Sequence, residues 1–183
     1  MISETLKRAS IVPAPLTPLG IVLASALMVL AASPSAMADS GRLMPRDVPA
    51  AYVQECGSCH TAYPPGMLPA RSWQRVMDGL ERHYGTDASV DADTLQKLNG
   101  WLQTHAGSYK RTREEPAQDR ITRSAWFARK HRRMDPQVWT HPSVKSAANC
   151  TACHTRANDG DYDDDNVRFP AGLHSRYRSA WTD

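Results

Sequence analysis

The sequence predicts a mainly α-helical fold with extensive loops. Apolar residues recur at spacings of three and four after residue 72 and after residue 93, and no stretch alternates apolar and polar residues as a half-buried strand would. The loops follow from composition, because the 183 residues include 13 prolines and 10 glycines. With a mean hydropathy of −0.52 the core is thin, so a bound group that ties segments together would help to stabilise it.

Residues 1–38 have the pattern of a signal peptide. A positively charged start precedes 14 apolar or small residues over 19–32, fewer than the roughly 20 that a membrane-spanning helix needs. The small-x-small pattern at 36–38 predicts cleavage before Asp39. We therefore expect an exported, periplasmic protein with no stable membrane insertion after cleavage; the alternative is an uncleaved anchor.

The charge of the remaining chain gives no argument for nucleic-acid binding. Removing 38 of 183 residues leaves 145, with 20 basic and 18 acidic side chains. The charges are unevenly distributed, however. Nine Lys or Arg lie between Lys110 and Arg133, and five Asp lie within 159–165. We expect one basic and one acidic surface.

All four cysteines lie in two copies of one pattern, C-x-x-C-H, at residues 56–60 and 150–154. In an exported chain this pattern is typical of covalent c-type haem attachment. The two thiols add to porphyrin vinyl groups as thioethers, and the adjacent His is placed to bind the iron. The sequence therefore predicts two covalently bound haem c groups, with cysteine and proximal histidine sets Cys56, Cys59 and His60, and Cys150, Cys153 and His154.

Three other interpretations of the cysteines fit less well. A thioredoxin-like pair needs a βαβ context, which neither copy has. Zinc binding by two C-x-x-C pairs would not call for His after both of them. Disulfides within each motif would close loops too short to add much stability.

In the first half of the chain we expect three helices and a proline-rich loop. A short helix over 48–59 leads into the first motif, and three prolines keep 63–69 extended. Ser72 can cap a helix whose apolar face runs from Trp73 to His83 and Tyr84 and ends at Gly85. A capping box of Asp93 and Gln96 begins a third helix that stops near residue 107.

The second half is less regular. Residues 108–119 are polar, without periodicity, and are interpreted as a linker. Pro136 and Pro142 interrupt the chain after a basic, aromatic stretch, and a short helix from Ser143 is expected to lead to the second motif. The acidic run at 159–165 is interpreted as a solvated turn, since it lacks the twelve-residue calcium loop. The predicted organisation is a signal peptide at 1–38, a first haem segment at 39–107, the linker at 108–119 and a second haem segment at 120–183.

Periodicity leaves the second ligand of each iron open. For the first haem, His83 and His105 both lie on apolar helix faces. For the second, His131 follows Trp126 and Phe127, whose rings could line a haem pocket. His141 and His174 are the alternatives. Methionine would be the competing ligand type and would raise the reduction potential. The candidates are then Met67, which has little chain to reach across the haem, and Met77 and Met134, which are better explained as core packing.

The chain resembles the small periplasmic dihaem cytochrome c family, typified by the partner of an oxygen-binding monohaem cytochrome. The resemblance rests on the first C-x-x-C-H motif, on residues 63–65 and 68–69, and on a helix that begins with a Trp and reaches residues 83–85. It also rests on three later segments, residues 121–123, 129–131 and 144–150. It covers nearly all of the chain after the signal. It implies two haems that each have two histidine ligands, with His83 and His131 as the distal ones. It also implies a membrane-bound quinol-linked donor and an oxygen-binding cytochrome as redox partners.

Iron with two protein ligands has no open position for substrate, so we expect a one-electron carrier and not an enzyme. The alternatives are a dihaem peroxidase or a gas-binding module, each with one distal ligand that can leave. The basic stretch from Lys110 to Arg133 is a candidate docking face for an acidic partner, although its side chains could instead pair with haem propionates.

Overall fold

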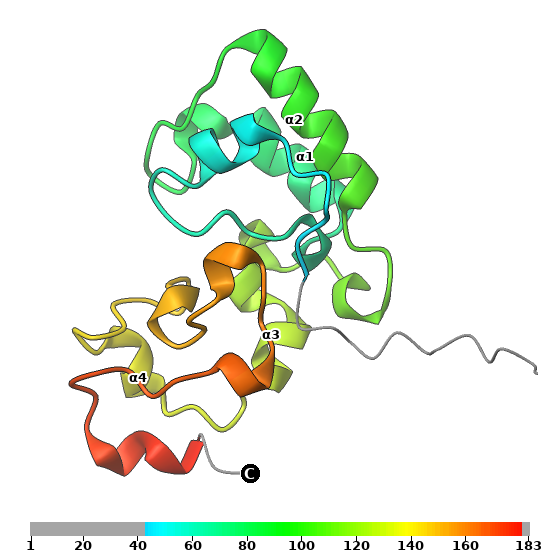
Figure 1. The fold of residues 1–183 in the computed structure, drawn as a ribbon. Helices are drawn as coiled ribbons and strands as arrows, with labels where there is room; N and C mark the ends of the chain where they lie inside the picture. The colour runs from blue at the N-terminus through cyan, green and yellow to red at the C-terminus, as the bar shows by residue number, and fades with distance from the viewer. Residues whose placement is uncertain (1–42, 181–183) are drawn as a thin grey trace, which may run out of the picture. The chain divides into compact units, whose positions relative to one another are not determined.

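The structure is a computed structural model that describes residues 43–180, with side chains up to residue 178. Within this range the backbone forms helices, short helical turns and two isolated β-bridges, and no strand. The mainly α fold with extensive loops is confirmed. The four α-helices (Figure 1) are α1 (Ala70–Asp78), α2 (Ala92–His105), α3 (Ala125–Lys130) and α4 (Pro136–Thr140). The predicted signal peptide and its cleavage site lie outside the described residues.

Helices α1 and α2 pack together and form the larger core. Leu98 and Leu102, four residues apart on α2, are almost fully buried against Trp73 and Met77 of α1. The Asp91 carboxylate caps α2 by accepting from the Thr94 N–H at 3.0 Å. The predicted capping box was therefore placed two residues late, because Asp93 lies inside the first turn.

Helix α1 differs from the prediction at both ends. It begins at Ala70 after Pro69, so Ser72 does not cap it but is buried in its first turn. It ends at Asp78, and Gly79 donates its N–H to the Val76 carbonyl at 3.3 Å. His83 and Tyr84 therefore lie beyond the helix, after a 3-10 turn at Leu80–Arg82, and not on its apolar face.

The proline-rich segment before α1 is not wholly extended. A 3-10 turn, Pro65–Met67, lies within it, because proline fits the first position of a helical turn, where its missing N–H is not needed. The Trp73 indole N–H donates to the Pro65 carbonyl at 2.7 Å and holds this turn against α1. The segment expected to be a linker, 108–119, contains two more 3-10 turns, at Lys110–Thr112 and Ala117–Asp119.

A second, smaller core lies around α4. Pro136 starts this helix instead of interrupting it, and the Asp135 carboxylate caps it by accepting from the Gln137 N–H at 2.8 Å. The expected helix from Ser143 is absent: residues 143–149 form turns, with a left-handed φ of 71° at Lys145. The buried members of this core are Val138, Val144, Leu173 and Tyr177.

The acidic run folds as a turn held by side chains. The Asp161 carboxylate lies 3.2 Å from the Arg156 guanidinium and accepts from the Asn166 amide at 3.1 Å. Among residues 43–180, no group of three or more His, Cys, Asp or Glu side chains could hold a metal ion without a cofactor. None of the helices in that range has the length and apolarity to cross a membrane.

Candidate haem sites

The first C-x-x-C-H motif begins in a π-helical turn, Tyr52–Cys56, which is shorter than the helix predicted there. Gly57 closes the turn by donating its N–H to the Val53 carbonyl at 3.0 Å. A Cβ at residue 57 would lie 2.2 Å from the same oxygen, so only glycine fits. The Ser58 hydroxyl donates to the Glu55 carbonyl at 2.9 Å and also holds the turn between the two thiols.

The second motif begins in a 3-10 turn, Cys150–Ala152. The N–H groups of Cys153 and His154 both donate to the Cys150 carbonyl, at 3.2 and 2.8 Å. Asn149 anchors this turn from outside, because its side-chain amide donates to the Val144 carbonyl at 2.9 Å. The second motif is thus tied directly to the small core around α4.

No disulfide joins any two of the four cysteines. Burial raises the pKa of Cys56, Cys150 and Cys153 to about 11, which reflects the weakly polar surroundings of these side chains. A redox-active pair or a thiolate metal site requires the opposite, a lowered thiol pKa. The surroundings therefore fit a covalently attached, largely apolar porphyrin better than either alternative.

His60 of the first motif faces His83. Their ring centres are 6.2 Å apart and the ring planes are inclined by 23°. The His60 Nδ1–H donates to the Thr61 carbonyl at 2.7 Å, which leaves Nε2 with its lone pair. His83 is placed by the turn after α1, in which Tyr84 and Gly85 have left-handed φ values of 51° and 99°. Desolvation, with the nearby charges of His60 and Arg120, lowers the pKa of His83, so its imidazole is neutral at neutral pH.

His154 of the second motif faces His131 at the same separation, 6.2 Å between ring centres, but with ring planes inclined by 73°. The His131 Nδ1–H donates to the Phe127 carbonyl at 2.9 Å, and the Phe127 ring stacks on the imidazole at 4.0 Å. The Nδ1 of His154 is buried without a protein partner. Desolvation is the main cause that lowers the pKa of both imidazoles, so both present neutral nitrogens to the space between them.

This arrangement passes a simple geometric test for haem ligation. A metal ion with imidazole nitrogens about 2 Å away on opposite sides would hold the two ring centres about 6 Å apart. Both pairs have that separation. In two of the four rings, furthermore, Nδ1 donates to a backbone carbonyl, which defines the state of the second nitrogen.

The remaining histidines lie in neither pair. The His105 Nδ1–H donates to the Trp101 carbonyl at 3.0 Å, and its Nε2 lies 3.2 Å from the Asp47 carboxylate. His141 and His174 each accept a backbone N–H two residues ahead through Nδ1, at 3.2 and 3.0 Å. Of the methionine candidates, Met77 and Met134 pack in or against the two cores, and Met67 is buried.

The two motifs are neighbours, a feature that the sequence did not reveal. The Tyr63 hydroxyl donates to the Ala148 carbonyl at 2.7 Å, and the Tyr63 ring stacks on His60 with ring centres 4.9 Å apart. Thr61 of the first segment donates to the Asn158 side chain at 3.0 Å. A cavity of about 400 Å³ lies between the motifs, with Cys59 and His60 on one side and residues 145–151 on the other. Tyr63 was visible in the sequence only as part of a proline-rich loop.

A model of the dihaem cytochrome c family matches residues 52–162, more than half of the chain. Two solved structures are also similar. A diheme cytochrome type c from Shewanella baltica OS155 is 35% identical with a TM-score of 0.59, over 68% of this chain and 96% of that one. A diheme cytochrome c from Rhodobacter sphaeroides is 34% identical with a TM-score of 0.57, over 63% and 98%. A search of curated proteins gave no match.

Proposed function

Because this chain belongs to the dihaem cytochrome c family and carries two covalently bound c-type haems, we propose that it is a periplasmic one-electron carrier with two histidine ligands on each iron. His60 and His83 are the proposed ligands of the first iron, and His154 and His131 those of the second. The proposed thioether bonds form on Cys56, Cys59, Cys150 and Cys153.

The observation that carries this proposal is the common 6.2 Å separation of two histidine pairs that lie far apart in sequence. Each pair joins the histidine of a C-x-x-C-H motif to one that follows a helix: His83 comes after α1 and its 3-10 turn, and His131 ends α3. A chance contact would be expected to leave an Nε2 atom engaged elsewhere, as the Nε2 of His105 is with the Asp47 carboxylate. This supports ligation by histidine over ligation by methionine.

The bound haem supplies reversible exchange of one electron between ferric and ferrous iron. The protein's part is to orient and protect the ligands. Carbonyls of Thr61 and Phe127 hold two imidazoles by their Nδ1–H groups, which directs Nε2 towards the iron position. Aromatic rings of Phe127, Trp139 and Tyr162 surround the second pair and exclude water from it.

Two ligands on each iron would leave no position for a substrate. The family is typically one of electron carriers, and a closed site restricts the chemistry to electron exchange at the haem edge. We therefore propose a carrier and not an enzyme. Its proposed partners are redox proteins: a membrane-bound quinol-linked donor and an oxygen-binding monohaem cytochrome c, both supported by the family resemblance.

Spectroscopy of the purified holoprotein tests this function. We expect two haems per chain by pyridine haemochrome, low-spin ferric spectra without an iron–methionine charge-transfer band, and no change when carbon monoxide is added to the reduced protein. Electron paramagnetic resonance should resolve two low-spin signals. Nearly parallel imidazole planes, 23° apart, split the iron d orbitals more than planes 73° apart.

Two results would contradict the proposal. An iron–methionine charge-transfer band would mean that methionine, and not one of the four histidines, is a ligand of one iron. A spectral shift when carbon monoxide is added to the reduced protein would mean that a distal ligand leaves, and would favour the peroxidase or gas-binding alternatives.

A further inference from the structure

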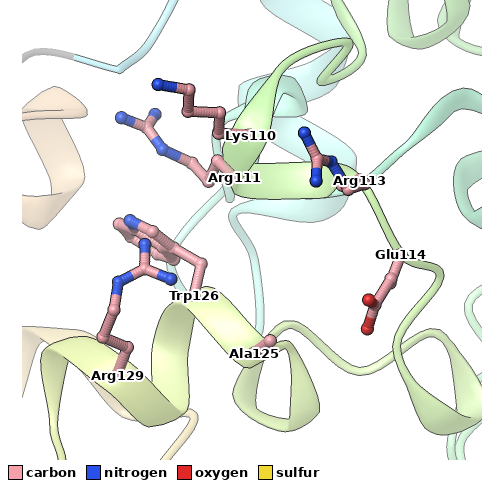
Figure 2. A pocket seen from close by; sticks show the side chains of 7 residues that line it. All are labelled: Lys110, Arg111, Arg113, Glu114, Ala125, Trp126 and Arg129. Carbon is pink, nitrogen blue, oxygen red and sulfur yellow. The ribbon is translucent and has the colours of Figure 1, made fainter.

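A cationic pocket lies beside the second haem site. Figure 2 shows the side chains of Lys110, Arg111 and Arg113 on one segment and those of Trp126 and Arg129 on α3, which together line the pocket. The cavity they line has a volume of about 390 Å³. It contains four cations against one carboxylate, Glu114, which lies on the far side of the group from Trp126.

The pocket and the haem site lie on different faces of α3. Phe127 and His131 are four residues apart and share the face that meets His154. Trp126 and Arg129 are three residues apart and share the face that lines the pocket. The side chains of α3 that line the pocket are therefore not those that contact the His131–His154 pair.

Much of this positive charge is not neutralised by the protein. Within residues 43–180, no carboxylate lies at ion-pairing distance from the side chains of Lys110, Arg113 or Arg129, and all three are exposed. The Arg111 guanidinium lies over the Trp126 indole, 5.0 Å from the ring centre. An aromatic ring framed by cations is typical of the centre of a protein interface, where Trp and Arg are enriched.

We propose that this pocket is a docking surface for a carboxylate-rich face of a redox protein, and that electrons pass there to or from the second haem. This docking proposal rests on the proposed electron-carrier function. It adds the chemistry of the partner's surface and the haem that exchanges the electron. Trp126 and Phe127 are adjacent, and Phe127 stacks on His131 at 4.0 Å, so a docked partner lies one short helix from the second site. One electron leaves the partner and reduces one ferric haem to the ferrous form; no bond is made or broken.

The test uses the holoprotein and an acidic flavodoxin as probe. The flavodoxin hydroquinone anion gives up one electron and becomes the neutral semiquinone. Arg113→Glu/Arg129→Glu is compared with Arg71→Glu/Lys97→Glu, which makes the same charge change at exposed residues of α1 and α2. Reduction is followed by stopped flow at several salt concentrations, and a neutral free flavin serves as the reductant that needs no docking. Binding of oxidised flavodoxin is measured separately by calorimetry.

We expect the pocket variant to lose about tenfold in bimolecular rate at about 10 mM salt, where charges act over roughly 30 Å. It should also lose most of the salt dependence and the calorimetric binding. The Arg71/Lys97 variant should stay close to the unmodified protein, and all three proteins should react equally with the neutral flavin.

Three results would overturn the docking surface: equal losses in both variants, flavodoxin binding unaffected by the pocket substitutions, or altered haem potentials in the pocket variant, which would assign these cations to a haem. Failure of the electron-carrier function would look different. Carbon monoxide would then shift the spectrum of the reduced unmodified protein, or an iron–methionine band would be present, while calorimetry would still report on the docking surface.

Discussion

At the scale of single residues, the proposed distal ligands differ from the other histidines in what their rings meet. His83 and His131 face the histidine of a C-x-x-C-H motif, whereas His105 is bonded through both ring nitrogens to other groups. Lowered pKa values keep both distal imidazoles neutral, the form in which a nitrogen lone pair is available to a metal.

Replacing either proposed distal ligand should open one iron. We expect His83→Ala and His131→Ala each to retain two covalent haems and to turn one of the two irons high-spin, able to bind one equivalent of carbon monoxide. His174→Ala is the control, because this histidine is exposed and its ring accepts a hydrogen bond from the backbone N–H of Arg176. Absorption and paramagnetic resonance spectra check this. Two fully low-spin haems in His83→Ala would rule out that residue as a ligand.

Gly57 allows a second prediction at this scale. An alanine methyl there would meet the Val53 carbonyl at 2.2 Å, so Gly57→Ala should disrupt the turn between Cys56 and Cys59 and lower haem incorporation at the first site only. Gly100→Ala is the control, since nothing lies within 4 Å of a methyl group at that position of α2. It should stabilise the protein by about 0.5–1 kcal/mol. Haem content by mass spectrometry and thermal unfolding distinguish the two.

At the scale of elements, the turn that holds His83 is supported from a distant segment. The Arg75 guanidinium of α1 contacts the Asp119 carboxylate at 2.6 and 2.9 Å. The Tyr84 hydroxyl, next to His83, donates to the Asp119 carbonyl at 3.0 Å, and Arg120 lies over the Tyr84 ring. The segment 117–120 thus braces both α1 and the loop that carries the proposed ligand.

This brace should make stability depend on pH in the acid range. Hydrogen bonding to Arg75 lowers the pKa of Asp119 below its usual value, so the stabilisation is complete above about pH 4 and is lost as pH falls through the lower folded-state value. Asp119→Asn should cost about 1 kcal/mol at pH 6–7, since the pair is partly exposed, and progressively less below pH 4. Denaturant unfolding at several pH values measures this. Arg71→Ala, on the same helix, should show no such trend.

The sequence predicted which elements exist better than where they end. The C-x-x-C-H motifs identify the cofactor because thiol spacing and adjacent histidine are fixed locally, and the family match bears this out. Periodicity found the helices now labelled α1 and α2. The apolar pattern continues past Gly79 to His83, so the predicted α1 was too long. A pattern of apolar residues does not reveal where the backbone turns. Pairing between His83 and His60, and between Tyr63 and Ala148, depends on tertiary contacts that no local pattern contains.

At the scale of the whole molecule, the two haem sites have unequal protein support. The first lies beside α1 and α2, of 9 and 14 residues, and six buried core residues. The second lies among α3 and α4, of 6 and 5 residues, with four buried core residues. Helices this short are not stable alone, so the C-terminal part depends more on its haem for folding.

Removing the haems one at a time should expose this asymmetry. Cys150→Ser/Cys153→Ser, which cannot attach the second haem, should leave the amides of α1 and α2 protected from hydrogen exchange while residues 120–180 lose protection. Cys56→Ser/Cys59→Ser is the reciprocal variant, and α2 should keep measurable protection in it because Leu98 and Leu102 still pack against Trp73 and Met77. Equal loss of protection across the chain in both variants would mean that the contacts between the motifs, through Tyr63 and Ala148, unite the two parts into one cooperative unit.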